Sequence, residues 1–229
     1  MKVLVACESS GVVRDAFAEA GHDAWSCDLL ESNGHPKHIT GNVLNIMNDG
    51  WDLMIAHPPC TYLSVSGMHW TTRGMRDPEL TEQALQFVQA LMDAPIERIC
   101  IENPVSVIST RIRKPDQIIQ PWMFGHDASK KTCLWLKNLP PLKHDLLDVV
   151  PPKGWKIANI LLDGIEMNRY KSHCGVLFKS CQDFSKKMIW GNQTPSGQNK
   201  LPPSKDRWQK RSETYFGIAR AMANQWGNV

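Results

Sequence analysis

The sequence predicts an α/β protein with a mostly parallel sheet covered by helices on both faces. Short apolar runs rich in β-branched residues alternate with segments of helical periodicity. Several of these runs end in a polar or proline-containing turn, where the functional groups of an open parallel sheet collect. Strands that alternate with helices favour βαβ units and a sheet buried on both sides.

Each element follows from a local pattern. Val13, Ala16 and Phe17 recur at helical spacing after the turn at residues 8–11, and two prolines at 58–59 stop the strand that precedes them. Glu102-Asn103-Pro104 is expected to close another strand in the same way. Expected strands cover residues 2–7, 24–27, 52–56, 96–101, 118–120 and 132–136, and expected helices cover residues 12–20, 82–92 and 215–225.

Composition narrows the class of protein. With 229 residues and 42% hydrophobic residues, the chain suits one compact domain with a full core and a small appendage, which excludes a disordered tail protein. No apolar run reaches the roughly 20 residues of a membrane span, and the opening KVLVAC is typical of a strand rather than a secretory leader. Seven cysteines, several of them in apolar runs, do not suggest a disulfide framework. We expect a cytoplasmic protein.

Positive charge is concentrated in residues 145–205. This stretch holds nine Lys/Arg and five Asp/Glu, whereas the chain as a whole carries a net charge of only +3. It is rich in proline and glycine, so it predicts a loop-rich basic insert between residues 1–144 and 206–229, which make up the rest of the domain. Such a stretch fits either a contact region for an anionic polymer or a solvated loop region. Trp70, Trp155 and Trp190 lie in loop-like contexts, and no metal site is expected.

Two strand ends carry residue types that suit covalent catalysis. Cys60 follows two prolines and is therefore held on a stiff loop, and Glu102 follows a neighbouring predicted strand. Together they could act as a nucleophile and a partnering acid. Taken singly, Cys60 also fits a turn residue and Glu102 a structural ion-pair partner, while His57 fits either the pocket lining or a turn.

The order of these motifs resembles the C5-cytosine DNA methyltransferases. The resemblance rests on the strand-turn-helix opening, the acidic residue after the second strand, DLMIAHPPCTYLS, ICIENP and the C-terminal SETYFGIARAMA. It covers residues 1 to about 140 and 207 to 227, and it implies a class I methyltransferase, Rossmann-like fold. It further implies that Cys60 is the nucleophile and Glu102 the acid, with Pro59 and Asn103 beside them in the catalytic motifs.

The resemblance also implies S-adenosylmethionine as cofactor. Asp28 matches the residue that binds the ribose, although a helix cap is an alternative, and Asn42 stands near the place of the adenine. The first motif, ACESSG, is poorer in glycine than is usual in the family. The implied cofactor-binding residues are Cys7, Glu8, Ser9, Ser10, Gly11, Asp28, Leu29, Asn42, Val43 and Pro58.

DNA is the implied partner, with the target cytosine flipped out of the helix. Small versions of this family resemble bacteriophage methylases that shield DNA from restriction, so the location would then be a bacterial host cell. The expected nucleic-acid contacts are Ser64, Lys130, Lys131, Lys186 and Lys187. The same chemistry on RNA or on a free pyrimidine nucleotide stays open, as does a catalytically silent nucleic-acid-binding protein with this fold.

Overall fold

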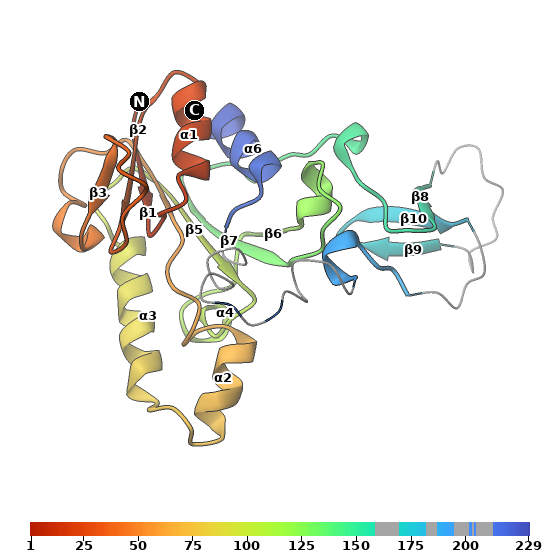
Figure 1. Ribbon diagram of the computed structural model, residues 1–229, viewed down its shortest axis with the longest axis horizontal. Helices are drawn as coiled ribbons and strands as arrows, with labels where there is room; N and C mark the ends of the chain where they lie inside the picture. Colours follow the sequence, from red (N-terminus) through yellow and green to blue (C-terminus); the bar gives the residue numbers. More distant parts are fainter. Residues whose placement is uncertain (159–169, 182–186, 195–201, 203, 205–212) are drawn as a thin grey trace.

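A mixed sheet lies at the centre of the molecule (Figure 1). The computed structural model describes residues 1–158, 170–181, 187–194, 202, 204 and 213–229. Within these residues, seven strands form the sheet in the order β3-β2-β1-β4-β5-β7-β6. Their bounds are β1 Lys2–Ala6, β2 Asp23–Asp28, β3 His38–Thr40, β4 Leu53–Ala56, β5 Arg98–Pro104, β6 Gln117–Ile119 and β7 Thr132–Lys137.

Most of the sheet is parallel. β1 pairs in parallel with both β2 and β4, and β2–β3 and β4–β5 are parallel as well. Only β7 runs the other way, antiparallel to β5 and to β6. The α/β class predicted from the sequence, with a mostly parallel sheet and helices on both faces, is therefore confirmed.

Helices cover both faces of this sheet. Val3 and Val5 of β1 face the side of α1 (Val12–Glu19) and α6 (Phe216–Trp226), whereas the alternate residues Leu4 and Ala6 face the side of α3 (Glu79–Met92). This alternation follows from the pleat of a strand. Both faces of the central strands are buried, as the apolar runs of the sequence predict. No described helix is long and apolar enough to cross a membrane.

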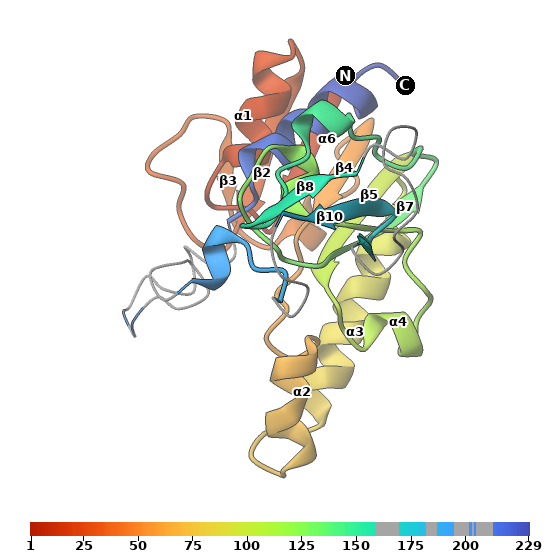
Figure 2. The ribbon, with the colours of Figure 1, turned by 90° about the vertical axis from the view of Figure 1, so that its right-hand side faces the viewer.

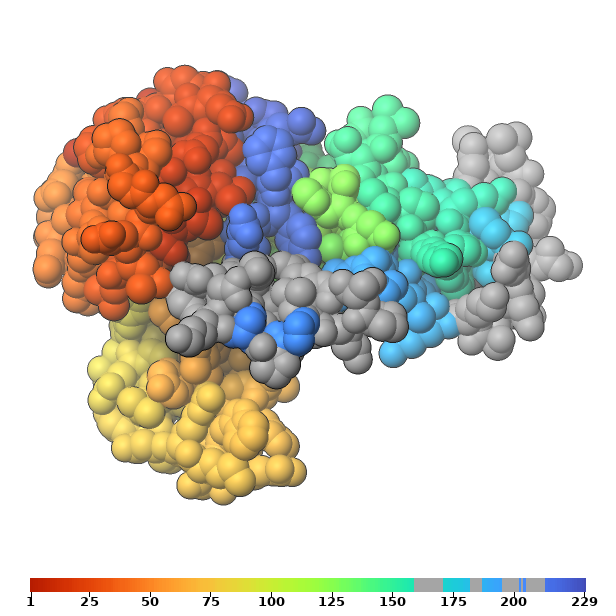
Figure 3. Space-filling model, in the orientation of Figure 1, coloured from red at the N-terminus to blue at the C-terminus, as the bar shows by residue number. Residues whose placement is uncertain are grey.

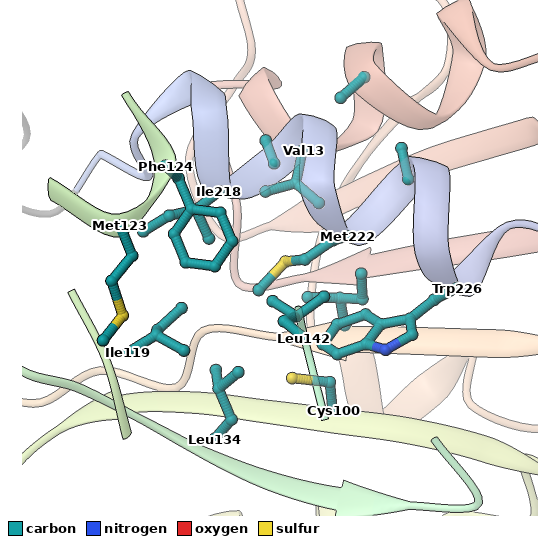
Figure 4. Close-up of a cluster of buried hydrophobic side chains, with 14 of the residues drawn as sticks. Val13, Cys100, Ile119, Met123, Phe124, Leu134, Leu142, Ile218, Met222 and Trp226 are labelled. Carbon is teal, nitrogen blue, oxygen red and sulfur yellow. The ribbon is translucent and has the colours of Figure 1, made fainter. Parts of the chain in front are cut away.

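The last helix packs along the first. α6 lies beside α1 in both ribbon views, and its buried residues include Ile218, Met222 and Trp226 (Figures 1 and 2). In the close-up of this core, Met222 lies near Val13 of α1, above the strand side chains of the sheet (Figure 4). Residues from the two ends of the sequence thus share one hydrophobic cluster.

A small antiparallel sheet occupies part of the predicted basic insert. Its strands are β8 (Trp155–Ile157), β9 (Tyr170–His173) and β10 (Val176–Ser180), in the order β8-β10-β9. The expectation of a loop is wrong for Trp155, which begins β8, whereas Trp190 lies outside the strands, directly before the 3-10 helix at Gly191–Gln193; the two are 5% and 3% exposed. Phe178 of β10 packs edge-on against Trp122 with ring centroids 5.4 Å apart, so this small sheet shares the hydrophobic core of the main one. The domain boundaries at 145 and 205 remain a prediction.

The remaining elements are short, and one helix among them follows the Pro-Pro-Cys loop. α2 (Val65–Thr72) and α3 form a lobe that projects from the main body (Figures 2 and 3). The short ones are α4 Ile108–Arg111, η1 Val43–Asn45, η2 Pro121–Phe124, η3 Leu146–Asp148 and η5 Gly191–Gln193. The expected end of the strand at residue 101 is wrong, because β5 continues through Glu102-Asn103-Pro104, paired with Leu134, Cys133 and Thr132 of β7.

Candidate functional site at the carboxyl edge of the sheet

The candidate residues gather at the carboxyl ends of β1, β2, β4 and β5. In the register of the sheet, Ala6 is level with Cys27 on one side and with Ala56 on the other. The chain leaves β1 toward β2 and later returns on the opposite side of β1 to form β4. Crevices at such a reversal of strand order are where open parallel sheets bind ligands.

The turn after β1 is shaped by Glu8. Its buried carboxylate accepts hydrogen bonds from the backbone N–H groups of Val13 at 2.8 Å and Arg14 at 3.2 Å. Ser10 Oγ donates to the same group at 3.2 Å. The N-cap position of α1 is Gly11, which has no side chain to satisfy these N–H groups. Glu8 therefore caps α1, a role that the sequence reasoning did not foresee.

Gly11 is required by its conformation and by a neighbour. Its φ of +78° lies in the left-handed region that favours glycine. A Cβ atom here would also collide with the guanidinium group of Arg14. Arg14 is only 3% exposed and donates to Ser26 Oγ at 3.0 Å and Ser32 Oγ at 3.3 Å, which fixes the segment after β2 against the turn. Ser9, beside this turn, is half-buried.

The end of β2 offers a carboxylate beside an exposed apolar side chain. Asp28 Oδ1 accepts the backbone N–H of Leu30 at 2.9 Å, and Leu29 next to it is 76% exposed. Asn42 is engaged differently from what was expected: its Oδ1 accepts the N–H of Leu44 at 3.0 Å and so caps η1. Val43 is buried in the core beneath it.

The Pro-Pro-Cys loop is tied to the end of β5. Asn103 is 1% exposed, and its Nδ2 donates to the carbonyl oxygen of Pro58 at 2.8 Å. Pro58 is buried, while Pro59 is exposed and Cys60 half-buried. The carbonyl oxygen of Cys60 accepts the N–H of Ser64 at 2.9 Å, which closes the loop into a turn before α2. Loop and strand end are thus one hydrogen-bonded unit.

Burial makes several cysteines of the main sheet and its edge unreactive. It raises the pKa of Cys7 to about 12, with the charge of Asp28 adding to the effect. It also raises the pKa of Cys27 and of Cys133 to about 11, and that of Cys100 well above its ordinary value. Such thiols stay protonated and inert. Cys7, expected at the cofactor, also has a φ of +58°, an uncommon conformation for a residue with a side chain.

Glu102 forms an ion pair with His57. His57 Nδ1 lies 2.9 Å from Glu102 Oε2, and both side chains are 13% exposed. Burial would lower the pKa of His57, but the hydrogen bond and charge of Glu102, with the charge of Glu8, raise it overall. Burial would raise the pKa of Glu102, but the hydrogen bond and charge of His57, with the charge of Lys130, lower it overall. Glu102 thus takes part in an ion pair, and its partner sits directly before the Pro-Pro-Cys loop.

A small pocket opens beside Glu102. Its lining brings together β5, the segment before β7 and the start of α6, through Glu102, Lys130, Thr132, Thr214, Tyr215 and Ile218. Lys130 was expected here from the sequence, whereas Thr214 and Tyr215 were not singled out. Both residues belong to SETYFGIARAMA, one of the segments that carry the resemblance, so the sequence did hold a signal for them.

The other expected nucleic-acid contacts do not line this pocket among the described residues. Ser64 is 9% exposed and its hydroxyl caps α2, accepting the N–H of Gly67 at 3.2 Å. Lys131 and Lys187 are exposed, and Lys186 lies outside the described residues. The structure thus places Lys130 beside Glu102 in the lining of the pocket, which does not include Lys131 or Lys187.

Comparisons with known proteins add one structural likeness. No family model and no curated protein matches the chain. The matching solved structures include a prophage-encoded protein of E. coli that is provisionally described as a DNA modification methyltransferase. The two chains are 14% identical, with a TM-score of 0.38, over 71% of this chain and 61% of the other. This chain therefore spans less than two thirds of that protein, and a likeness of this size identifies no function.

Proposed function

We propose that this chain is an S-adenosylmethionine-dependent methyltransferase that acts on carbon 5 of cytosine in DNA. One observation carries the proposal: the loop that bears Cys60 is hydrogen-bonded through Asn103 and Pro58 to the strand end that bears Glu102. A thiol and a carboxyl group on one unit, at the carboxyl edge of a mostly parallel sheet, suit addition to an electron-poor ring.

The reaction needs both groups because carbon 5 of cytosine is a poor nucleophile. The electron pair of the Cys60 thiolate forms a bond to carbon 6, and the ring becomes an enamine with negative charge developing toward N3. Glu102 is placed to pass on to N3, as that charge develops, the proton that it shares with His57. When a base later removes the carbon 5 proton, the double bond re-forms and the sulfur leaves as thiolate. The cytosine must leave the helical stack to be reached.

The ends of β1 and β2 fit the cofactor in chemistry. Among the described residues, Asp28 uses only Oδ1, so its other oxygen can accept a ribose hydroxyl. The exposed side chain of Leu29 offers apolar surface for an adenine ring. Asn42 fits less well, because its carbonyl oxygen already accepts a backbone N–H. When bound, S-adenosylmethionine supplies the activated methyl group that carbon 5 acquires.

Methyl transfer from labelled S-adenosylmethionine, measured in parallel on DNA, RNA and dCMP, tests the substrate class. We expect label in DNA and none in a Cys60→Ala variant. A 5-fluorocytosine substrate should trap the protein covalently, because the final proton removal is blocked. Transfer by Cys60→Ala, or failure to trap the wild type with a good substrate, would show that this mechanism is wrong. Binding of nucleic acid without any transfer would favour the silent-protein alternative.

DNA affinity is proposed to come mainly from phosphate contacts. Lysine and arginine side chains in residues 145–205 would bind phosphates of any DNA sequence, so they add affinity without sequence preference. Lys187, which is exposed, is one of these lysines. A stretch this short leaves room for few side chains in the major groove, so we expect a target of about one to three specified bases. Bisulfite sequencing of a methylated random library measures the target length.

A further inference from the structure

His57 lies between the two groups on which the proposed reaction depends. It is the first residue after β4, and its backbone N–H donates to the carbonyl oxygen of Ala6 at 2.9 Å. The Pro-Pro-Cys loop begins at the next residue. The backbone of His57 is therefore held by β1 on one side and by a stiff loop on the other. This fixes the backbone position from which the imidazole side chain extends.

The ring of His57 holds one oxygen of Glu102. β4 and β5 are adjacent and parallel, with Ala56 level with Ile101, so the next residue of each strand is side by side. The contact between His57 Nδ1 and Glu102 Oε2 is 2.9 Å, and among the described residues the carboxyl group of Glu102 makes no other hydrogen bond. Oε2 is therefore occupied, while Oε1 has no protein partner there.

This hydrogen bond does not depend on one charge state of His57. Three charged groups act on the ring: Glu102 and Glu8 favour the protonated imidazole and Lys130 opposes it. Nδ1–H donates to a carboxylate both in imidazolium and in the neutral Nδ1–H tautomer. His57 Nε2 is buried and has no hydrogen-bond partner among the described residues, so the Nδ1 bond is the one polar contact that orients the ring there.

We propose that His57 is a positioning residue for Glu102: it fixes Oε2 and thereby orients the carboxyl group so that Oε1 meets the ring of the substrate base. The inference rests on the proposed function. Its physical basis is that a glutamate side chain with several rotatable bonds is useful in a transition state only when another group locks its orientation.

Two variants of His57 separate positioning from packing. His57→Phe keeps a ring of similar size but removes the donor, whereas His57→Asn keeps an N–H donor near the place of Nδ1. We expect His57→Phe to lower kcat about 10- to 100-fold, with unchanged affinity for S-adenosylmethionine, and His57→Asn to recover much of that loss. The kinetic pKa that reports Glu102 should rise in His57→Phe, because the hydrogen bond and positive charge that lower it are gone.

The control is His22→Phe, which changes a histidine in the turn before β2, at the opposite end of the strands. It should leave kcat unchanged. Wild-type kcat in His57→Phe, or equal losses in His57→Phe and His57→Asn that follow their loss of thermal stability, would overturn the positioning role. If the wild type transfers no methyl group to any substrate, the proposed function fails; if it does and His57→Phe behaves like wild type, only this inference fails.

Discussion

Replacing Glu8 by alanine should destabilise the fold through the start of α1. The buried carboxylate of Glu8 accepts the backbone N–H groups of Val13 and Arg14, at residues that are 0% and 3% exposed. In Glu8→Ala these two N–H groups lose their acceptor in a place that water reaches poorly. Each buried donor left without a partner costs roughly 1–3 kcal/mol.

The expected loss follows from these terms. The two unpaired N–H groups would lower the free energy of unfolding by about 2–6 kcal/mol. The variant also lacks the buried carboxylate and its desolvation cost, which offsets part of this loss, so we expect a net loss of about 2–3 kcal/mol. For a chain of this size that corresponds to a fall in Tm of about 4–12 °C. Glu8→Gln keeps an acceptor oxygen but loses the charge at the helix N-terminus, so it should lose about 1–2 kcal/mol.

Urea denaturation followed by far-ultraviolet circular dichroism measures these differences. Glu19→Ala is the matched control, because Glu19 is exposed at the other end of α1, and it should change stability by less than about 0.5 kcal/mol. The capping argument is refuted if Glu8→Ala is as stable as Glu19→Ala. Loss of S-adenosylmethionine binding at unchanged stability would instead return Glu8 to the cofactor site that the sequence suggested.

Three further outcomes are expected. Gly217→Ala should lose about 1–3 kcal/mol, measured by urea denaturation, because its Cβ would collide with the carbonyl oxygen of Phe124 and push α6 away from η2. The stability of Glu102→Gln should fall furthest below that of wild type between pH 4.5 and 6.5. These limits are the ordinary pKa values of Glu102 and His57, and between them the ion pair contributes its full stabilisation. The difference in stability between variant and wild type should shrink as the pH rises through the raised pKa of His57, because the imidazole loses its charge. It should also shrink as the pH falls through the lowered pKa of Glu102, because the carboxylate is then protonated. Asp28→Ala should weaken S-adenosylmethionine binding by about 1.5–3 kcal/mol in calorimetry.

Controls for these outcomes lie close in the fold. Gly41→Ala should be tolerated, because a Cβ there meets no atom within 4 Å, and an equal loss in both glycine variants would contradict the collision argument. Asp23→Ala changes the carboxylate at the opposite end of β2 and should leave cofactor affinity unchanged. A difference between Glu102→Gln and wild type that stays constant from pH 4 to 9 would contradict the ion pair.

The sequence predicted the fold better than it predicted individual contacts. The alternation of apolar runs and helical segments located all seven main-sheet strands except the three-residue β3, because long-range pairing in a parallel sheet demands continuous buried runs. It ended β5 too early, since a proline was taken to close the strand, yet Pro104 is accommodated as its last residue. Trp155 was placed in a loop because the three-residue strand β8 carries too little periodicity to be recognised.

The candidate site was predicted in outline. Cys60 and Glu102 stand on neighbouring strand ends, as the motif order required. The ion pair of Glu102 with His57 joins residues 45 positions apart, and only the register of β4 and β5 brings them together. Glu8 was assigned to the cofactor because a polar turn after a first strand is typical of such sites, whereas the missing side chain of Gly11 makes it a helix cap.

The packing of α6 against α1 affects how the chain can fold during synthesis. Every strand of the main sheet is made before residues 216–226, yet these residues cover the apolar side of α1 and of the central strands. Until they leave the ribosome, side chains such as Phe17 have no partner from the last helix and present a surface on which nascent chains can associate. Contacts between such distant parts of a sequence also slow folding. The pocket beside Glu102, which Tyr215 and Ile218 help to line, therefore takes its final form only after the last helix has docked.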